Sequence, residues 1–479
     1  MGLKGGATGV KAVLKDAVPG AFRKYDCLTD LRQDVNTTRD KCAIALDGNV
    51  LMMAVPSTIT TFDQYCRVVY GYVRDAVSAG SLVVVVFDEP DFVSRAKQCE
   101  QQKRDRAYSK KKVCFSDDQT GNYPLTDAYD LVELRSLANV HILKENRATR
   151  MRFYDEVMRY VYERIQTQMK SWSKSGHDSG DLLIDGADPR GGLRPVDVAR
   201  VAQVYGTSGE TALEFGSRPQ GIGEGDLKLQ DVTDKIRKAH TTPSSRLSQF
   251  TLVVQVTIDT DCIPISLTSE AKERAAGVCN FERAGGVHCV LAMRERRSGN
   301  DRSSYTSVDV SLLETNLQRL LWGSPRRSPS DLQMAGAMCL VVAAMICSGC
   351  DFVNLKGARF DHFFNALPGL VRLNPEIGES LYREAETCEV PTKLAVESVR
   401  SLCVCAATFM HELPRYKKQA GLVKNTDDLT LKRVLWTLTY WKAAEPAATE
   451  NWGFFYENEP LASDRYIGDS RKSTFECCI

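Results

Sequence analysis

The sequence has almost no net charge, because its 62 Lys and Arg residues balance 61 Asp and Glu residues to leave a formal charge of +1. A chain without a global basic field does not attract nucleic acid over its whole surface, so any such binding must come from local basic patches. The six histidines form no motif. The glycine-rich stretch GSRPQGIGEG lacks the Lys-Ser/Thr of a P-loop and is not a Rossmann fingerprint, which argues against both nucleotide-binding classes.

The chain also lacks a secretory signal peptide and a regular cysteine framework, although it holds 16 cysteines. This combination predicts reduced thiols in an intracellular compartment, either cytoplasm or nucleus. No apolar run looks long and uninterrupted enough to span a bilayer, so we expect a soluble chain. Cys347 and Cys350 have zinc-like spacing, but without a second pair or a partnering His we expect them to pack in a buried strand or helix.

Apolar runs alternate with helical patterns over much of the chain, which predicts an α/β fold with a central, mostly parallel sheet flanked by helices. We expect a core at about 1–355, with a long amphipathic helix near 145–170 and a loop or insertion near 171–192. Residues 356–479 should form a helical C-terminal region, whose aromatic tail packs on the core. Prolines at 368, 375, 391 and 414 should punctuate its helices.

The most informative positive feature is a set of acidic residues that follow apolar runs. A strand that ends in a carboxylate places that group at the carboxyl edge of a parallel sheet, where α/β folds put their sites. Several converging carboxylates repel one another, and divalent metal is the usual way to hold them ionised. We therefore predict a metal site. Strand ends are expected before Asp47, Asp88 and Asp351, and extended segments at the pairs Glu224/Asp226 and Asp259/Asp261. The predicted ligands are Asp47, Asp88, Glu224, Asp226, Asp259, Asp261 and Asp351.

Two further features fit a phosphodiester substrate. In the basic segment after Asp88, the side chains of Lys97, Gln101 and Arg104 share one helical face, and such donors suit a phosphate group, although a solvated helix face is the commoner meaning of a charge run. Near the C-terminus Trp452 is the aromatic residue that we expect to stack a base, whereas Phe454 and Phe455 are expected to pack in the core.

These residues, in this order, resemble the metal-dependent 5′ nuclease superfamily, and within it the XRN-type 5′→3′ exoribonucleases. The segment Asp47-Gly48-Asn49 is similar to the family's first acidic motif, and Asp88 with Lys97, Gln101 and Arg104 to its second. Further matches, which span most of the chain, are Gly223-Glu224-Gly225-Asp226-Leu227-Lys228, Asp259-Thr260-Asp261, Gly349-Cys350-Asp351-Phe352, and Trp452 followed by Pro460-Leu461-Ala462-Ser463-Asp464.

The resemblance implies a PIN-like 5′ nuclease core in which the seven acids hold two Mg²⁺ ions, with Mn²⁺ as the alternative, for two-metal hydrolysis of a phosphodiester. It implies single-stranded RNA with a 5′-monophosphate as substrate, with DNA as a possible alternative. Lys97, Gln101 and Arg104 would form the 5′-phosphate pocket, and Trp452 would stack a base.

The chain departs from the family pattern at three positions. Asp105 stands where the family has Arg in the phosphate pocket, Met53 where it has a stacking His, and Asp226 where it has Glu. Two alternatives stay open: a structure-specific flap endonuclease or 5′ exonuclease on DNA, and an RNA-binding protein on an inactive nuclease fold. The region after Asp351, LKGARFDHFFNAL, lacks the glycine-rich hairpin that a DNA clamp would need.

Overall fold

The computed structural model describes residues 9–88, 131–144, 147–174, 180–185, 204–206, 224–240, 245–276, 286–295, 304–323, 328–350, 352–353, 355, 357–387, 391–441, 455–456 and 466–467. Among these, eight strands form one sheet in the order β1-β8-β7-β6-β2-β3-β4-β5. The five central strands, from β7 to β4, run parallel, and the neighbours at each edge are antiparallel. The strands are β1 (Phe22–Tyr25), β2 (Cys42–Asp47), β3 (Leu82–Val86), β4 (Asp181–Asp185), β5 (Val204–Gly206), β6 (Leu252–Thr257), β7 (His288–Glu295) and β8 (Ser304–Asp309).

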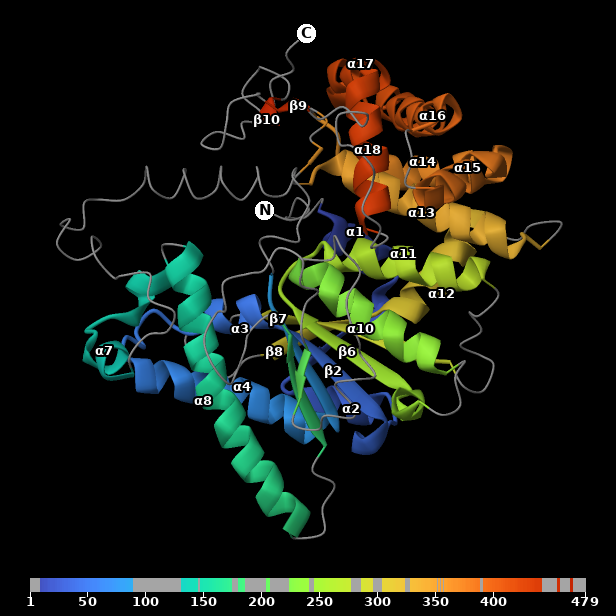
Figure 1. Ribbon diagram of the computed structural model, residues 1–479. Helices are drawn as coiled ribbons and strands as arrows, with labels where there is room; N and C mark the ends of the chain where they lie inside the picture. Colours follow the sequence, from blue (N-terminus) through green and yellow to red (C-terminus); the bar gives the residue numbers. More distant parts are fainter. Residues whose placement is uncertain are drawn as a thin grey trace.

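Helices cover both faces of this sheet (Figure 1). One face carries α2 (Leu28–Asp34), α3 (Gly48–Met53), α4 (Phe62–Ala79) and α8 (Arg147–Lys174), with α7 (Leu131–Ser136) beside α4. The other face carries α1 (Val10–Ala17), α10 (Gly225–Ala239), α11 (Cys262–Ala275) and α12 (Val310–Trp322). The α/β expectation, with a mostly parallel central sheet, is therefore confirmed.

The buried strands explain how both faces are filled. Along β2, Ala43 and Ala45 pack with the α10 and α11 side, whereas Ile44 and Leu46 pack with the α4 and α8 side. Successive side chains of a strand point to opposite faces, so a strand covered by helices on both sides is apolar throughout. This is why the sequence of β2 is continuously apolar up to Asp47.

The C-terminal region is helical, as expected, and its core is continuous with the α10 and α11 face of the sheet. Its helices are α13 (Asp331–Ser348), α14 (Phe360–Leu373), α15 (Pro375–Thr387), α16 (Lys393–His411), α17 (Lys417–Lys424) and α18 (Asp428–Trp441). Two short strands, β9 (Phe455–Tyr456) and β10 (Tyr466–Ile467), pair with each other. The rest of the aromatic tail lies outside the described residues.

Several local predictions need correction. The segment 171–192 was expected to be a loop, but it contains the end of α8 and strand β4, which pairs with β3. Pro368 was expected to mark a helix end, but it lies inside α14. The expected breaks at the other prolines are confirmed: Pro375 begins α15, Pro391 precedes α16, and Pro414 begins a short 3-10 helix (Pro414–Tyr416). The long helix expected near 145–170 is α8.

Two described helices, α13 and α16, are long and apolar enough to cross a membrane by length and composition, contrary to the expectation of no such run. In the folded chain 78% of the apolar window of α13 and 50% of that of α16 are buried inside the protein. From Ala335 to Ser348 every residue of α13 is buried. A helix that is apolar on all sides is typical of the interior of a large fold as well as of a membrane span, and α13 occupies that interior position.

The crossing of α13 and α15 depends on two glycines. A Cβ atom added at Gly336 would lie 2.4 Å from the backbone carbonyl carbon of Gly378, and one at Gly378 would meet Gly336 at 2.7 Å. Backbone cannot move aside as a flexible side chain can, so the two helices approach this closely because both positions lack a side chain.

We predict that Gly336→Ala destabilises the protein by about 1–3 kcal/mol, because the added methyl forces the two helices apart. Gly369→Ala, in α14, is the matched control because a Cβ there meets no atom within 4 Å. Since Ala is favoured over Gly in a helix, the control should leave stability unchanged or raise it by up to about 1 kcal/mol. Thermal unfolding of both variants gives the comparison, and equal stabilities would contradict the close crossing.

Candidate active site

Three acidic residues lie at the carboxyl ends of three adjacent parallel strands. Asp47 ends β2, Asp88 follows β3 by two residues, and Asp259 follows β6 by two residues. Strand β2 pairs with β3 on one side and with β6 on the other. The prediction that these three acids share one edge of the sheet is therefore confirmed, because their strands are neighbours and point the same way.

Helix α10 brings a second group of acids to this edge. The backbone N–H of Gly225 donates a hydrogen bond to Asp88 Oδ1 at 2.7 Å, which joins the start of the helix to the end of β3. A Cβ atom at Gly225 would lie 3.2 Å from Asp88 Oδ1 and 3.6 Å from Asp47 Oδ1. Glu224 is the N-cap residue of α10 and Asp226 lies in its first turn. The absent side chain at Gly225 therefore allows the start of α10 to approach Asp88 closely.

The two closely spaced acid pairs are not in extended segments, as the sequence had suggested. Glu224 and Asp226 stand at the start of a helix, and Asp261 occupies the N-cap position of α11, just after the turn that holds Asp259. Helix N-termini expose unpaired N–H groups and a partial positive charge, so they suit carboxylates better than an isolated strand does. The acids are brought together by the carboxyl edge of the sheet and by the N-terminal ends of three helices, α3, α10 and α11.

Backbone and side-chain donors also hold three further carboxylates in place. Asp47 caps α3, with Oδ1 accepting from the N–H groups of Asn49 at 2.9 Å and Val50 at 3.2 Å. Asp259 Oδ1 accepts from the N–H of Asp261 at 3.1 Å. The Cys262 thiol donates to Asp226 Oδ1 at 2.9 Å. These bonds orient the carboxylates before any ligand is bound.

The electrostatics show that the acids act on one another. Burial, followed by the charges of Asp88 and Asp259, raises the pKa of Asp47 to about 8. Burial, followed by the charges of Asp259, Asp47 and Asp261, raises the pKa of Asp226 well above its ordinary value. Desolvation and like charge both disfavour an ionised carboxylate, and a bound cation relieves both.

Side chains from neighbouring elements enclose this acidic edge. A Cβ atom at Gly48 would lie 2.4 Å from the ring of Phe87, so the residue after Asp47 must be small for α3 to start here. Burial raises the pKa of Tyr154, on α8, to about 12, and the charges of Asp47 and Asp88 add to the shift. Helix α8 therefore covers the edge from the α4 side.

The donor chemistry fits a hard divalent cation, because the set consists of carboxylates, several of them buried and oriented. Among the described residues no group of three His, Cys, Asp or Glu side chains already surrounds a single point closely enough to hold an ion. Several carboxylate oxygens are instead engaged by backbone N–H groups or by the Cys262 thiol. The residues fit a metal centre in chemistry and placement, and the described geometry is that of a site whose carboxylates are spread apart.

Five predicted site residues lie outside the described part of the chain: Asp351, Lys97, Gln101, Arg104 and Trp452. The apolar run before Asp351 was read as a strand end, and this is wrong, since the run is helix α13. Sequence reasoning also gave no role to Gly225, Thr257 or Cys262, which contact the acids directly. The Gly between two acids was the signal that could have identified Gly225.

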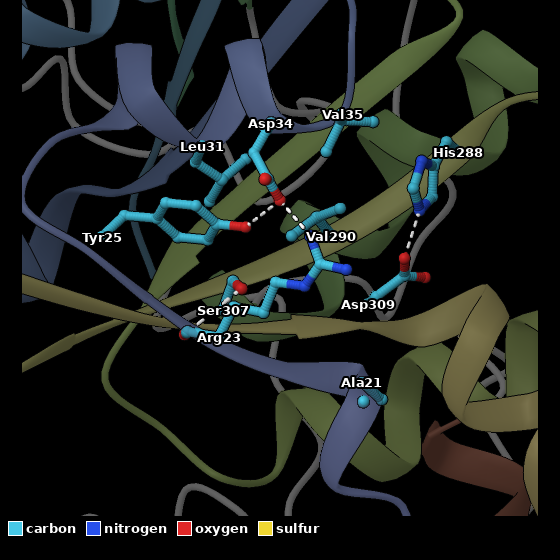
Figure 2. Close-up of a pocket in the computed structure, with 11 residues that line it drawn as sticks. Ala21, Arg23, Tyr25, Leu31, Asp34, Val35, His288, Val290, Ser307 and Asp309 are labelled. Atoms are coloured by element: carbon cyan, nitrogen blue, oxygen red, sulfur yellow. Dashed lines mark hydrogen bonds and ion pairs between the residues drawn. The ribbon is translucent and has the colours of Figure 1, made fainter.

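A separate pocket of about 230 Å³ lies at the opposite edge of the sheet (Figure 2). His288 at the start of β7 pairs with Asp309 at the end of β8, at 2.9 Å. Asp34 pairs with Arg23 and accepts from Tyr25 Oη. Carboxylates within the pocket balance its cations, so the pocket offers no net positive charge to a phosphate group. The pocket also lies away from the acidic edge and is not part of that site.

A scan against models of known protein families matched none, and a search of curated, characterised proteins found no significant relative. The resemblance to the 5′ nucleases therefore stays a prediction.

We predict that the metal-free protein loses stability as the pH rises from about 5 to about 8. The folded state keeps a proton on Asp47, with a pKa of about 8, which the unfolded chain releases near pH 4. The stability that this proton contributes is fully present below the pKa of Asp47 in the unfolded chain. It is lost as the pH rises through the pKa of Asp47 in the folded state. Thermal unfolding in chelator across this range tests it.

The matched variant is Asp47→Asn, which keeps an oxygen acceptor for the cap of α3 but cannot ionise. In chelator at about pH 8 it should raise stability by about 1–3 kcal/mol and flatten the pH dependence. Asp16→Asn, at an exposed position on α1, should change neither. A pH profile of Asp47→Asn identical to that of the unmodified protein would show that the acidic edge does not control stability.

Proposed function

We propose that this protein is a Mg²⁺-dependent 5′→3′ exonuclease that degrades single-stranded RNA bearing a 5′-monophosphate. The observation that carries the proposal is the meeting of Asp47, Asp88 and Asp259, from three adjacent parallel strands, with the acids at the start of α10. The coupled, raised pKa values of Asp47 and Asp226 support it, because they mark groups that gain most from a bound cation.

The seven acids would hold two divalent ions, Mg²⁺ or alternatively Mn²⁺, which supply charge neutralisation and an activated water for phosphodiester hydrolysis. The chain itself would do the positioning. The Gly225 N–H holds Asp88, and Thr257 Oγ1 accepts from the N–H of Asp259 at 3.0 Å, which fixes the turn after β6. Preorganised carboxylates lose little freedom when the ions and the substrate bind.

The substrate contacts come from the sequence resemblance. Lys97, Gln101 and Arg104 would bind the 5′-phosphate, with Asp105 weakening the pocket by repulsion, and Trp452 would stack a base. Within the described residues, the apolar side chains of Met53 at the end of α3 and Ile258 before Asp259 are 48% and 45% exposed. Ile258 is the neighbour of Asp259 in the sequence, and Met53 ends the helix that starts after Asp47, so both offer apolar surface on which a base could rest.

We predict that Asp259→Ala abolishes Mg²⁺-dependent cleavage, by about a thousandfold or more, while RNA binding survives. The assay uses end-labelled single-stranded RNA carrying 5′-monophosphate, 5′-hydroxyl or 5′-triphosphate, with a DNA flap alongside. Mononucleotide release from the monophosphate RNA alone is the expected result for the unmodified protein.

Asp16→Ala, on the exposed face of α1, serves as the control and should cleave normally. Cleavage by Asp259→Ala at the unmodified rate would falsify the metal-site assignment. Cleavage of the flap in place of RNA would move the protein to the DNA branch of the superfamily, and no cleavage by the unmodified protein would favour a binding role.

The phosphate pocket is tested separately. We predict that Lys97→Ala reduces the preference for 5′-monophosphate over 5′-hydroxyl RNA by about 10- to 150-fold, because one charge-assisted contact contributes about 1.5–3 kcal/mol. Cleavage of 5′-hydroxyl RNA should change little, which makes that substrate the internal control. An unchanged preference would place the phosphate pocket elsewhere.

A further inference from the structure

A cluster of exposed cations lies far from the acidic edge, on α17 and the 3-10 helix (Pro414–Tyr416) before it. We call it the α17 surface, and its exposed cations are Arg415, Lys417, Lys418 and Lys424. None of these four forms an ion pair with another side chain in the part of the chain that the structure describes. Some exposed cations elsewhere, such as Arg23 and Arg135, are paired with Asp34 and Asp63. The α17 surface thus gathers four exposed cations within ten residues, between the exposed acids Glu412 and Asp427.

The α17 surface is held firmly to the fold. Tyr416 Oη accepts a hydrogen bond from Arg359 Nη1 at 2.5 Å, and the His362 ring lies edge-on at 4.5 Å from the Tyr416 ring. Gly357 adopts a φ of 76° and packs so closely that a Cβ atom would lie 2.6 Å from Gln419 Cγ. These contacts tie the surface to the segment that follows the predicted ligand Asp351.

Helix α18 sets the distance between this surface and the acidic edge. At its C-terminal end the Trp441 carbonyl accepts from Thr268 of α11, the helix that begins directly after Asp261. The 14 residues of α18 span about 21 Å at 1.5 Å per residue. Figure 1 shows α17 at the end of α18 that is remote from α11. A strand whose 5′ end lies at the acids would have to extend several nucleotides to reach α17.

We propose that the α17 surface binds the phosphate backbone of the substrate strand, several nucleotides to the 3′ side of the cleaved bond. The inference rests on the proposed function for the identity of that strand. Charge complementarity favours a polyanion, and spaced cations along a short helix suit the repeating phosphates of a single strand. A membrane fits less well, since Leu422 is the one large apolar side chain exposed among these cations in the described residues.

The first test is equilibrium binding of a long single-stranded RNA to the full chain in chelator, followed by fluorescence anisotropy at several salt concentrations. Lys417→Glu with Lys418→Glu should weaken binding at least about tenfold at low salt. Losing two phosphate contacts should reduce the slope of log K against log salt by about 1.4, or 0.7 per contact. The matched control is Lys15→Glu with Lys41→Glu, an equal charge change at two exposed sites on α1 and before β2, which should bind almost normally.

The second test is cleavage of two 5′-monophosphorylated substrates, a trinucleotide too short to reach α17 and a long RNA. The α17 variant should raise KM for the long RNA about tenfold and leave kcat/KM for the trinucleotide unchanged. An unaltered salt slope, or an equal loss on both substrates, would overturn the α17 inference while leaving the nuclease proposal standing. Conversely, if the unmodified protein cleaves no substrate but the α17 variant still binds RNA more weakly, the nuclease proposal alone is refuted. Competition by a poly-glutamate peptide as strong as that by RNA would assign the surface to an acidic protein segment and reject the RNA.

Discussion

The repulsion among buried carboxylates at one edge of the sheet is the constraint on which the rest of the structure depends. Asp47 sits at the end of a completely buried strand, between the strands that carry Asp88 and Asp259. Burial of the carboxyl group is the main reason why the pKa of Asp47 rises to about 8, and the like charges of Asp88 and Asp259 add to the rise. Hydrogen-bond donors from neighbouring elements are therefore needed to stabilise the carboxylates. An arrangement with this electrostatic cost is typical of a functional site.

Three helix starts supply the donors. Helix α3 begins after Asp47, α10 directs the Gly225 N–H at Asp88, and α11 begins at Asp261, whose own N–H is bonded to Asp259. Each start presents N–H groups that have no partner within their own helix. The bonds offset part of the repulsion but leave a raised pKa at two of the acids. A bound divalent cation would reduce the remaining repulsion among the carboxylates, which the hydrogen bonds at the helix starts do not remove.

The sequence alone predicts Asp47, Asp88 and Asp259 as a group, because each follows a short apolar run with strand composition. It fails at the run before Asp351, where α13 is buried on every side and so shows no helical periodicity that would separate it from a strand. It misses β4 because tertiary pairing with β3 overrides the loop-like composition around it. The helix starts at Glu224 and Asp261 are also missed, since a two-residue spacing of acids is equally compatible with a strand and with a cap.

A nuclease with an acidic edge faces an electrostatic conflict, because the carboxylates that bind metal also repel the phosphates of the substrate. The Debye length is about 8 Å at physiological ionic strength, so the repulsion is local and a distant basic surface cannot cancel it through solvent. With a net charge of +1, the chain cannot rely on a long-range field either. Substrate must instead be held by direct contact at several separated points. The exposed cations on α17, beyond the length of α18, would satisfy that requirement on the 3′ side, and the predicted pocket at Lys97, Gln101 and Arg104 would do so at the 5′ end.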